Sequence, residues 1–485
     1  MPQQGFPEFS ATTDVGAVRH PGSVARDAKA GQIRMTGSGE NIWGRTDAFT
    51  FAWKMVDGDV TCRTDIEWVG AGRNPHRKAG WMIRAGLEPD DPYVDAVLHG
   101  DGLISMQYRV IKGGETAEVK SAITGPATLT FERTGDQFTL FVHGPNGALH
   151  PAGTITVPLP GAACAGLVVC SHDSAVAETA LFTNVAMSEL GRIADTARVL
   201  ESSLETFDVQ NGVRTIVRRA REHFEAPNWS RDGRTLIYNS GGLLYSLPVG
   251  GGEPQKINTG AANRCNNDHG ISWDGTKLVV SHSAEDGKSR IYLLPAQGGE
   301  PVLVTARGPS YWHGWSPDDR TLAYCAERNG EYDVYTIPVT GGDERRLTDA
   351  PGLDDGPEYS PDGRTIYFNS VRTGQMKIWK MGPDGSGQAQ VTPDDSYGDW
   401  FSHPSPDGRV ILFLSYEKSV EGHPPNKDVV LRLMSTGGGD VATLTHLFGG
   451  QGTLNVHSWS PDGKKFAFVS YRLVAALPPN AGPRP

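Results

Sequence analysis

The sequence lacks the features of a membrane-spanning or secreted chain. No run of about 18 apolar residues is present, which is the length that a membrane-spanning helix needs. The segment Met1–Phe6 has neither the basic region nor the apolar stretch of a secretory leader. We therefore expect no membrane span and a cytoplasmic location for the chain as written, or a periplasmic one if a leader has been removed.

Cysteine is also scarce. The chain has five cysteines, an odd number without any CxxC pair: Cys62, Cys164, Cys170, Cys265 and Cys325. This spacing argues against a disulfide framework and predicts buried free thiols.

Basic residues do not predominate, and several catalytic motifs are missing. The 45 Lys and Arg against 56 Asp and Glu give a net charge of −11, which argues against a nucleic-acid partner. The chain has no P-loop, so we expect no nucleotide cofactor, and it has no GxSxG or HExxH motif. A propeller-gated serine peptidase is excluded because no segment reads as an α/β-hydrolase domain.

What the sequence does contain is a repeat. An aromatic or apolar residue followed by a Ser-x-Asp-Gly-like turn occurs six times, with its serine at Ser230, Ser272, Ser316, Ser360, Ser405 and Ser460. The spacings of 42, 44, 44, 45 and 55 residues are close to the length of one four-stranded propeller blade. Each unit continues with alternating strands joined by Asp-Gly or Gly-Gly hairpin turns. Six units in register predict a six-bladed β-propeller.

The last unit ends after two strands. Two further strands, 203–209 and 213–217, lie directly before the first unit. We expect them to complete the final blade, so that both ends of the repeat region close the ring and leave no open sheet edge.

The Trp-Ser-Pro-Asp-Gly repeats resemble those of TolB-type propellers over roughly residues 201–473. The resemblance implies a TolB-like six-bladed propeller over residues 196–485. It specifies the fold more closely than the function, because such propellers serve as binding scaffolds, peptidase gates and polysaccharide lyases.

Residues 1–195 carry no such repeat and alternate short strands with Gly, Asp and Pro turns, which predicts an antiparallel β-sandwich. The stretches 77–84 and 166–172 resemble concanavalin-like jelly rolls of carbohydrate-active proteins. The chain as a whole is thus expected to be all-β, a jelly-roll sandwich followed by a propeller. Residues of the first domain that could take part in binding, or belong to ordinary sandwich surface, are Trp43, Arg84, His99, Gln107 and Arg109.

Histidines interrupt the repeat near the start of several blades. His269, His313 and His457 lie two residues before the repeat's aromatic or apolar position, and His403 lies one before it. Equivalent positions in different blades converge on one axis, and imidazole is a ligand for divalent metals. These histidines with Gln451 therefore predict a site for Mn, Zn or Ca. The alternative is that they hydrogen-bond to backbone or line a wet channel.

Other polar residues are expected on the same face, in the connections before the innermost strands. Asp268 and Asp355 are candidate acid–base groups, unless they hold turns as loop acids often do. The long connection 416–428 suggests a functional loop. Arg264 and Lys427 could bind a carboxylate or sugar hydroxyls. The residues that we expect to contact a substrate by charge, hydrogen bonding or stacking are Asn267, Tyr311, Trp312, Arg328, Arg372, Trp400 and His423.

The histidine-bearing repeats are similar to those of oligogalacturonate lyases, which use axial histidines and a glutamine to hold a divalent metal. This resemblance implies metal-assisted β-elimination on an oligosaccharide, with Arg264 or Lys427 as the base. Hydrolysis through Asp268 and Asp355 remains open. The other hypothesis is a non-catalytic TolB-like scaffold that binds a glycan or a protein partner. The sequence leaves the oligomeric state open.

Overall fold

The computed structural model describes residues 9–144, 147–193 and 197–476, and every regular element in these ranges is a β-strand. The predicted all-β class is confirmed. The segment on which a leader was sought lies outside the described residues. Within them, no helix is long and apolar enough to cross a membrane. All five cysteines are buried and free, as predicted.

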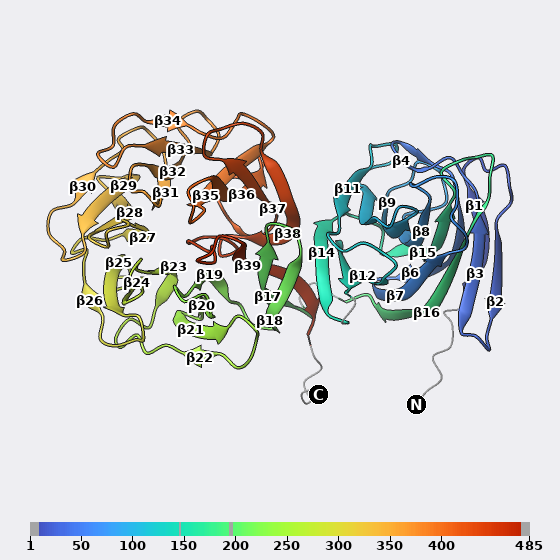
Figure 1. Ribbon diagram of the computed structural model, residues 1–485, viewed down its shortest axis with the longest axis horizontal. Coiled ribbons are helices and arrows are strands. Elements are labelled where there is room, and N and C mark those ends of the chain that lie inside the picture. The colour runs from blue at the N-terminus through green and yellow to red at the C-terminus, as the bar shows by residue number, and fades with distance from the viewer. Residues whose placement is uncertain (1–8, 145–146, 194–196, 477–485) are drawn as a thin grey trace. The chain divides into compact units, whose positions relative to one another are not determined.

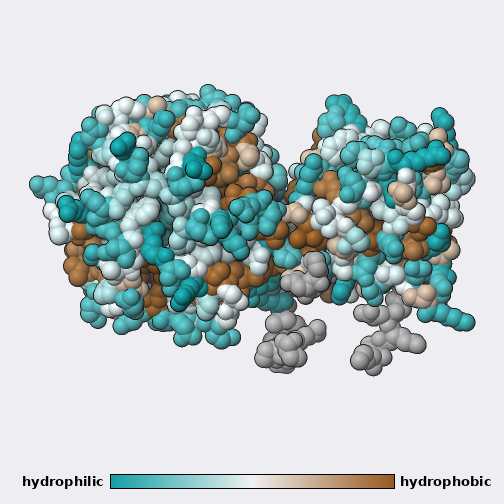
Figure 2. All heavy atoms as spheres, viewed as in Figure 1, coloured by the Kyte–Doolittle hydropathy of each residue, from teal (hydrophilic) through white to brown (hydrophobic). Residues whose placement is uncertain are grey.

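The chain divides into two compact units. One comprises residues 1–199, 213–215 and 473–485, and the other comprises residues 200–212 and 216–472. In the view of Figure 2, hydrophilic side chains cover most of the visible surface of each unit.

The first unit is built from two seven-stranded antiparallel sheets. One sheet has the order β1 (Ala11–Val15), β6 (Phe49–Asp57), β15 (Ala162–Cys170), β8 (Lys78–Arg84), β9 (Tyr93–His99), β10 (Ile104–Arg109) and β11 (Ala117–Lys120). The other has the order β14 (Leu149–Thr156), β13 (Gln137–His143), β12 (Thr128–Thr134), β7 (Asp59–Trp68), β16 (Glu178–Gly191), β3 (Gln32–Gly37) and β2 (Ser23–Asp27). A small ladder joins β4 (Ile42–Trp43) to β5 (Thr46–Asp47).

One apolar core lies between these two sheets. Strand β7 shows the required alternation, because Val60, Cys62, Thr64 and Ile66 are buried while Thr61, Arg63 and Asp65 are less so. The apolar side chains of this buried set pack in one cluster with Trp81 and Ile83 from β8 of the facing sheet. The two sheets therefore form a sandwich around a shared interior.

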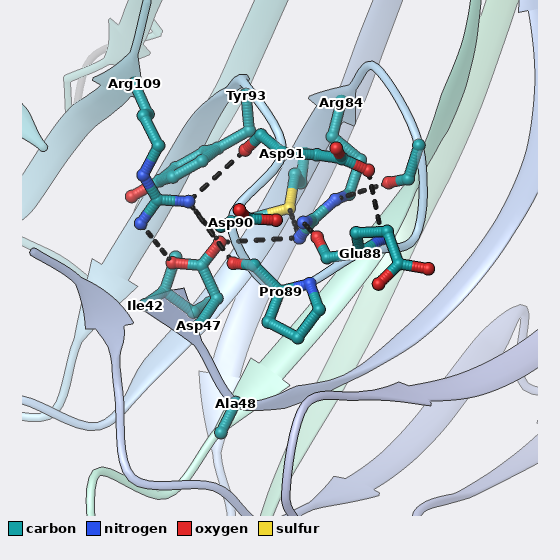
Figure 3. Close-up of polar contacts among 12 residues, drawn as sticks. Ile42, Asp47, Ala48, Arg84, Glu88, Pro89, Asp90, Asp91, Tyr93 and Arg109 are labelled. Atoms are coloured by element: carbon teal, nitrogen blue, oxygen red, sulfur yellow. Dashed lines mark hydrogen bonds and ion pairs between the residues drawn. The ribbon is translucent and has the colours of Figure 1, made fainter. Parts of the chain in front are cut away.

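The outer face of β8, β9 and β10 is buried as well, and a charged network lies on it (Figure 3). Arg109 donates two hydrogen bonds of 2.8 Å to the carboxylate of Asp47, and Arg84 binds the carbonyls of Gly86 and Glu88. Arg84 and Arg109 are fully buried. Buried charges need such paired, hydrogen-bonded partners. We conclude that these two arginines fix the surrounding loops.

The second unit is a ring of six sheets (Figure 1). The first two complete blades consist of β19 (Glu225–Trp229), β20 (Thr235–Ser240), β21 (Leu243–Pro248) and β22 (Gln255–Lys256), then β23 (Cys265–Ile271), β24 (Lys277–Ser283), β25 (Ser289–Pro295) and β26 (Val302–Leu303). The next two are β27 (Ser310–Trp315), β28 (Thr321–Arg328), β29 (Glu331–Pro338) and β30 (Arg345–Arg346), then β31 (Asp354–Tyr359), β32 (Ile366–Ser370), β33 (Lys377–Met381) and β34 (Ala389–Gln390). The fifth is β35 (Tyr397–Pro404), β36 (Val410–Glu417), β37 (Pro425–Ser435) and β38 (Ala442–Gly450).

The final blade confirms the predicted closure. Its sheet has the order β18 (Arg214–Ala220), β17 (Arg198–Asp208) and β39 (Lys465–Ala475), and a bridge from Trp459 to Phe466 adds the innermost position. Strands from before the first repeat and after the last therefore share one sheet.

The Ser-x-Asp-Gly repeat builds a turn in each blade. In the fourth blade, Ser360 Oγ donates to Asp362 at 2.6 Å and accepts from the Thr365 amide, while Gly363 has φ 70°. In the third blade Asp319 takes the glycine position with φ 57°, and its carboxylate accepts the backbone N–H groups of two residues in the preceding blade's turn. The repeated acids thus hold turns.

We predict that the pairing of the closing strands is a measurable part of the propeller's stability. Phe207 of β17 and Phe466 of β39 are buried, and their rings stack with centroids 5.0 Å apart. Phe207→Ala and Phe466→Ala should each lower the free energy of unfolding by about 3–5 kcal/mol. The double variant should lose less than the sum, by about 0.5–1.5 kcal/mol.

Urea unfolding followed by tryptophan fluorescence measures these differences. Val302→Ala, at a side chain that is 67% exposed, is the control and should change stability by less than about 0.5 kcal/mol. Strictly additive losses in the double variant would contradict the stacked pair.

Candidate functional site

The propeller contains a cavity of about 550 Å³. Its lining combines carboxylic acids, amides, histidines and aromatic rings: Glu225, Asn266, Asn267, Asp268, Tyr311, His313, Cys325, Tyr332, Leu353, Asp355, Phe401, His423, Gln451 and Asn455. Most of these residues belong to innermost strands, which surround the centre of the ring in Figure 1. The volume falls in the range of small-molecule sites.

β-bulges position these side chains. The register of the innermost strand shifts once in each of the five four-stranded blades, and the shifts lie at Glu225/Asn228, Cys265/His269, Trp312/Gly314, Asp355/Glu358 and Trp400/His403. A bulge leaves residues unpaired in the ladder and re-aims their side chains. This corrects our expectation that the polar residues stand in connections before the innermost strands, because most of them lie within bulged strands.

Asp268 is the most thoroughly held acid of the cavity. The Asn266 side chain donates to one carboxylate oxygen and the Asn455 side chain to the other, each at 2.6 Å. Burial and the nearby Asp355 nevertheless raise the pKa of Asp268 to about 6, against the opposing effects of His313 and the two amides.

Glu225 is a second acid with a raised pKa. Burial, reinforced by the charge of Asp268, raises the pKa of Glu225 to about 7, although the Asn267 side chain hydrogen-bonds to it. The two carboxyl groups are therefore close enough to repel each other when both are ionised.

Asp355 has the opposite behaviour. Burial favours its neutral form, but the charge and hydrogen bond of His313, together with His423 and the Gly356 N–H, outweigh burial and lower the pKa of Asp355. His313 Nε2 lies 3.2 Å from this carboxylate, and His423 Nε2 lies 4.0 Å away. Although burial opposes protonation of His313, Asp355 raises the pKa of that ring. The pair is best described as imidazolium and carboxylate.

Aromatic rings complete the cavity. Phe401 has φ 53° and lies parallel to the His313 ring, with centroids 6.0 Å apart. A positive φ at a bulky residue is strained and persists where the surroundings enforce it. Here Asn369 accepts the Phe401 N–H at 2.9 Å. The Tyr311 and Tyr332 rings lie 6.5 Å apart.

The structure brings part of the predicted set together. The predicted residues that line the cavity are Asn267, Asp268, Tyr311, His313, Asp355, His423 and Gln451. The predicted residues outside this lining are Arg264, His269, Trp312, Arg328, Arg372, Trp400, His403, Lys427 and His457.

Several of the predicted residues outside the lining are held by ion pairs or by apolar packing. Arg328 binds Glu344 in a buried ion pair, and Arg372 binds Asp354 and Gln388. Trp312 and Trp400 are only 2% exposed and pack in the propeller's apolar clusters, so neither offers a free stacking face.

The two candidate bases, Arg264 and Lys427, are exposed and do not reach the cavity lining. His269 is fully buried, and burial lowers its pKa to about 4. These positions leave the cavity without a lysine or arginine among its lining residues, all of which the structure describes.

The histidines do not assemble as a metal site. Glu358 accepts hydrogen bonds of 2.6 Å from His403 Nδ1 and His457 Nδ1, one on each carboxylate oxygen. His403 Nε2 also lies 3.2 Å from the Leu454 carbonyl, so both of its ring nitrogens face oxygen acceptors. A metal ligand needs a free lone pair on nitrogen. Among the described residues, no group of three or more His, Cys, Asp or Glu could hold a metal ion. The residues therefore do not fit the expected metal.

Sequence reasoning missed five polar or aromatic members of the lining, namely Glu225, Asn266, Tyr332, Phe401 and Asn455. A positional signal was available for two of them. The residue four before the repeat's aromatic or apolar position lines the cavity in five of the six blades, as Glu225, Asn267, Tyr311, Asp355 and Asn455.

The first-domain residues also have defined places. His99 contacts Ser105 at 3.1 Å, and Gln107 donates to Glu118 at 3.1 Å on the same sheet face, whereas Trp43 is 41% exposed. His99 and Gln107 are buried, and the polar groups that they contact belong to neighbouring strands of the same sheet.

We predict that Glu225 destabilises the propeller at neutral and basic pH. Its pKa of about 7 in the folded state exceeds the ordinary value near 4.5, so the folded state binds the extra proton between these limits. Stability from this group is present below pH 4.5 and is lost as pH rises through 7. Glu225→Gln should therefore raise stability by about 1–3 kcal/mol at pH 8 and leave it unchanged at pH 4.

Thermal unfolding at both pH values measures this effect. Glu253→Gln, at an exposed carboxylate, is the matched control and should behave as wild type at each pH. If Glu225→Gln were equally or less stable than wild type at pH 8, the buried-acid description of Glu225 would be wrong.

We predict that Glu358 stabilises the propeller through its contacts with His403 and His457. Burial favours the neutral acid, but His457 and His403 lower the pKa of Glu358 to about 2. Glu358→Ala leaves the buried His403 ring and the partly buried His457 ring without their shared anion and should cost about 3–5 kcal/mol of stability at pH 6. Glu421→Ala, at an exposed position, should cost little. A Mn²⁺-dependent rise in melting temperature that Glu358→Ala removes would instead show a metal site.

Comparison with known proteins places the second unit in a family. A family model described as the TolB beta propeller domain matches residues 303–448. An uncharacterised protein of Agrobacterium fabrum strain C58 is 52% identical over 273 residues, which are 56% of this chain and 93% of that protein.

Solved structures agree on the fold. A candidate TolB from Agrobacterium tumefaciens is 52% identical, with a TM-score of 0.55 over 57% of this chain and 99% of that one. An oligogalacturonate lyase in complex with manganese is 13% identical over 54% of this chain and 70% of that one, and its TM-score of 0.36 is too low to support an argument about function. The matched residues cover nearly the whole length of both 52%-identical relatives. The chain therefore belongs to the family of TolB-like β-propellers.

Proposed function

We propose that the propeller is a carbohydrate-active enzyme that hydrolyses a glycosidic bond in the central cavity. One observation carries the proposal. Asp268 and Asp355 line the same cavity, and their surroundings shift the two pKa values in opposite directions. Acid–base hydrolysis of a glycoside needs one protonated and one ionised carboxyl group, and such a divergence identifies the pair.

The roles follow from the contacts. Protonated Asp268 donates its proton to the glycosidic oxygen as the bond from that oxygen to the anomeric carbon breaks. Asp355, held as a carboxylate by His313, accepts a proton from the water whose oxygen bonds to the anomeric carbon. Asn266 and Asn455 fix the Asp268 carboxyl group in one orientation.

The remaining lining residues suit a sugar. The amides of Asn267 and Gln451 can donate to and accept from hydroxyl groups, and the rings of Tyr311 and Tyr332 offer apolar faces with a polar tip. Metal-assisted elimination fits less well, because Glu358 engages His403 and His457 and the two candidate bases lie outside the cavity lining.

We further propose that residues 1–195 form a concanavalin-like jelly roll and that residues 196–485 form the propeller domain. The two seven-stranded antiparallel sheets around one core support the first assignment. In this proposal the oligosaccharide or glycan is the partner of the propeller cavity.

A second function has one observation in its favour. Both oxygens of Asp268 already accept hydrogen bonds, as they would in an acid that only shapes a binding pocket. A non-catalytic scaffold that binds a glycan or a protein partner would use the same cavity without turnover.

The two functions are separated by assaying reducing-end release from a panel of oligosaccharides. Wild type should be most active below pH 6, because Asp268 loses its proton as pH rises through about 6. Asp268→Asn and Asp355→Asn should each lower kcat by about 10²–10⁴-fold while binding persists. Asp440→Asn, at an exposed position, is the control.

Binding without release of reducing ends across the panel would favour the scaffold. Products with the ultraviolet absorbance of an unsaturated uronate would favour elimination and overturn hydrolysis.

A further inference from the structure

The charge of the cavity restricts what can enter it. Three of the lining residues, Glu225, Asp268 and Asp355, are carboxylic acids, and none of the lining residues is lysine or arginine. His313 lies 3.2 Å from Asp355, and its charge also lowers the pKa of Asp268. Glu225 therefore has no such cationic partner among the lining residues, all of which the structure describes.

One buried acceptor also lacks a donor. Asn455 is 1% exposed, and its amide nitrogen donates to Asp268 at 2.6 Å. That contact requires N–H groups on the Asp268 side and so turns the amide oxygen away from Asp268. This oxygen has no hydrogen-bond partner among the described residues. A buried polar atom in this state calls for a partner that the chain does not supply.

The nearby arginines cannot provide the missing charge. Arg328 is held by Glu344, the Ser310 hydroxyl and the Pro309 carbonyl, and Arg372 is held by Asp354 and Gln388. Both guanidinium groups bind acceptors in their own blades. Neither is therefore free to donate to Glu225 or to the Asn455 amide oxygen.

We propose that the cavity binds a glycan that carries a protonated primary amine, with the ammonium placed between the Glu225 carboxylate and the Asn455 amide oxygen. The inference rests on the proposed function for the glycan and adds its substrate class, an amino sugar. An ammonium has three donors and no acceptor, which suits a carboxylate and an amide oxygen that both accept hydrogen bonds. The Tyr311 and Tyr332 rings add faces that attract cations.

The electrostatics of the acids agree with this placement. Burial and mutual repulsion raise the pKa of Glu225. An ammonium beside Glu225 favours its ionised form, and the negative charge of Glu225 then favours the protonated Asp268 that hydrolysis needs. The other titratable groups that face Glu225 are His223, at 4.0 Å, and Tyr471. Those that face Asp268 are His313, Asp355 and Tyr311.

Calorimetric titration of the full chain at pH 7 with three oligosaccharides of equal length tests the proposal. The probes are a β-1,4-linked glucosamine tetramer, its N-acetylated form and a galacturonate tetramer. The amine should bind about tenfold or more tightly than the acetylated form, since a hydrogen bond to a charged group contributes about 1.5–3 kcal/mol. The galacturonate should bind most weakly.

Variants assign the effect to residues. Glu225→Gln should weaken binding of the amine by about tenfold and leave the acetylated tetramer unaffected, because only the amine uses the charge. Glu253→Gln, at an exposed carboxylate, should leave both affinities unchanged. Equal affinity for the amine and the acetylated form, or preference for the uronate, would overturn the proposal.

A lysine tetrapeptide is the fourth probe in the titration. If it bound as tightly as the amino sugar, the cavity would recognise cationic protein segments and the glycan assignment would be wrong. Tight binding of the amine without release of reducing ends would remove the hydrolase and keep this inference. Hydrolysis of uncharged oligosaccharides with no preference for amines would do the reverse.

Discussion

Closure of the ring is the constraint on which the rest of the propeller depends. Strands β17 and β18 come from before the first repeat, and β39 comes from after the last, yet they form one sheet. Without this pairing, β39 and the first blade would present open edges. Closure also brings Glu225 of the first blade and Asn455, near the last, to the same cavity, although they are far apart in sequence. The site therefore exists only in the closed ring.

The same architecture separates structural from functional residues. What recurs in every blade, such as the Ser360–Asp362 turn, makes its hydrogen bonds locally and lies outside the cavity lining. What differs between blades is the residue at the bulge of the innermost strand. A bulge costs little in a propeller because the neighbouring strand and the next blade still pack on either side. Variation in chemistry is thus confined to positions that do not carry the fold.

The sequence predicted the fold closely and the site only in part. The six turns and two leading strands indicated the ring, because turn chemistry and strand alternation are local properties. His313 was found because it lies at a recurring offset from the repeat, and Asp268 and Asp355 were found because they are acids in the segments that lead into the innermost strands. The predicted histidine ligands do not come together among the described residues, because Glu358 lies between His403 and His457, a contact set by three different blades. Arg372 was likewise predicted to bind a substrate, but its guanidinium group is paired with Asp354. Such pairings are tertiary, so spacing alone cannot reveal them.

The buried acids of the propeller fall into two groups, and the difference bears on function. Glu358 lies between two imidazoles, and its pKa is lowered, so its charge supports the folded state. Glu225 and Asp268 have raised pKa values, so their ionisation opposes folding near neutral pH. A fold shaped only for stability gains nothing from two such acids beside each other. Strain of this kind concentrates where a site must be prepared before its ligand arrives. The raised pKa values of these two carboxyl groups, and the Asn455 amide oxygen, which has no hydrogen-bond partner among the described residues, therefore support a donor-rich ligand for the cavity.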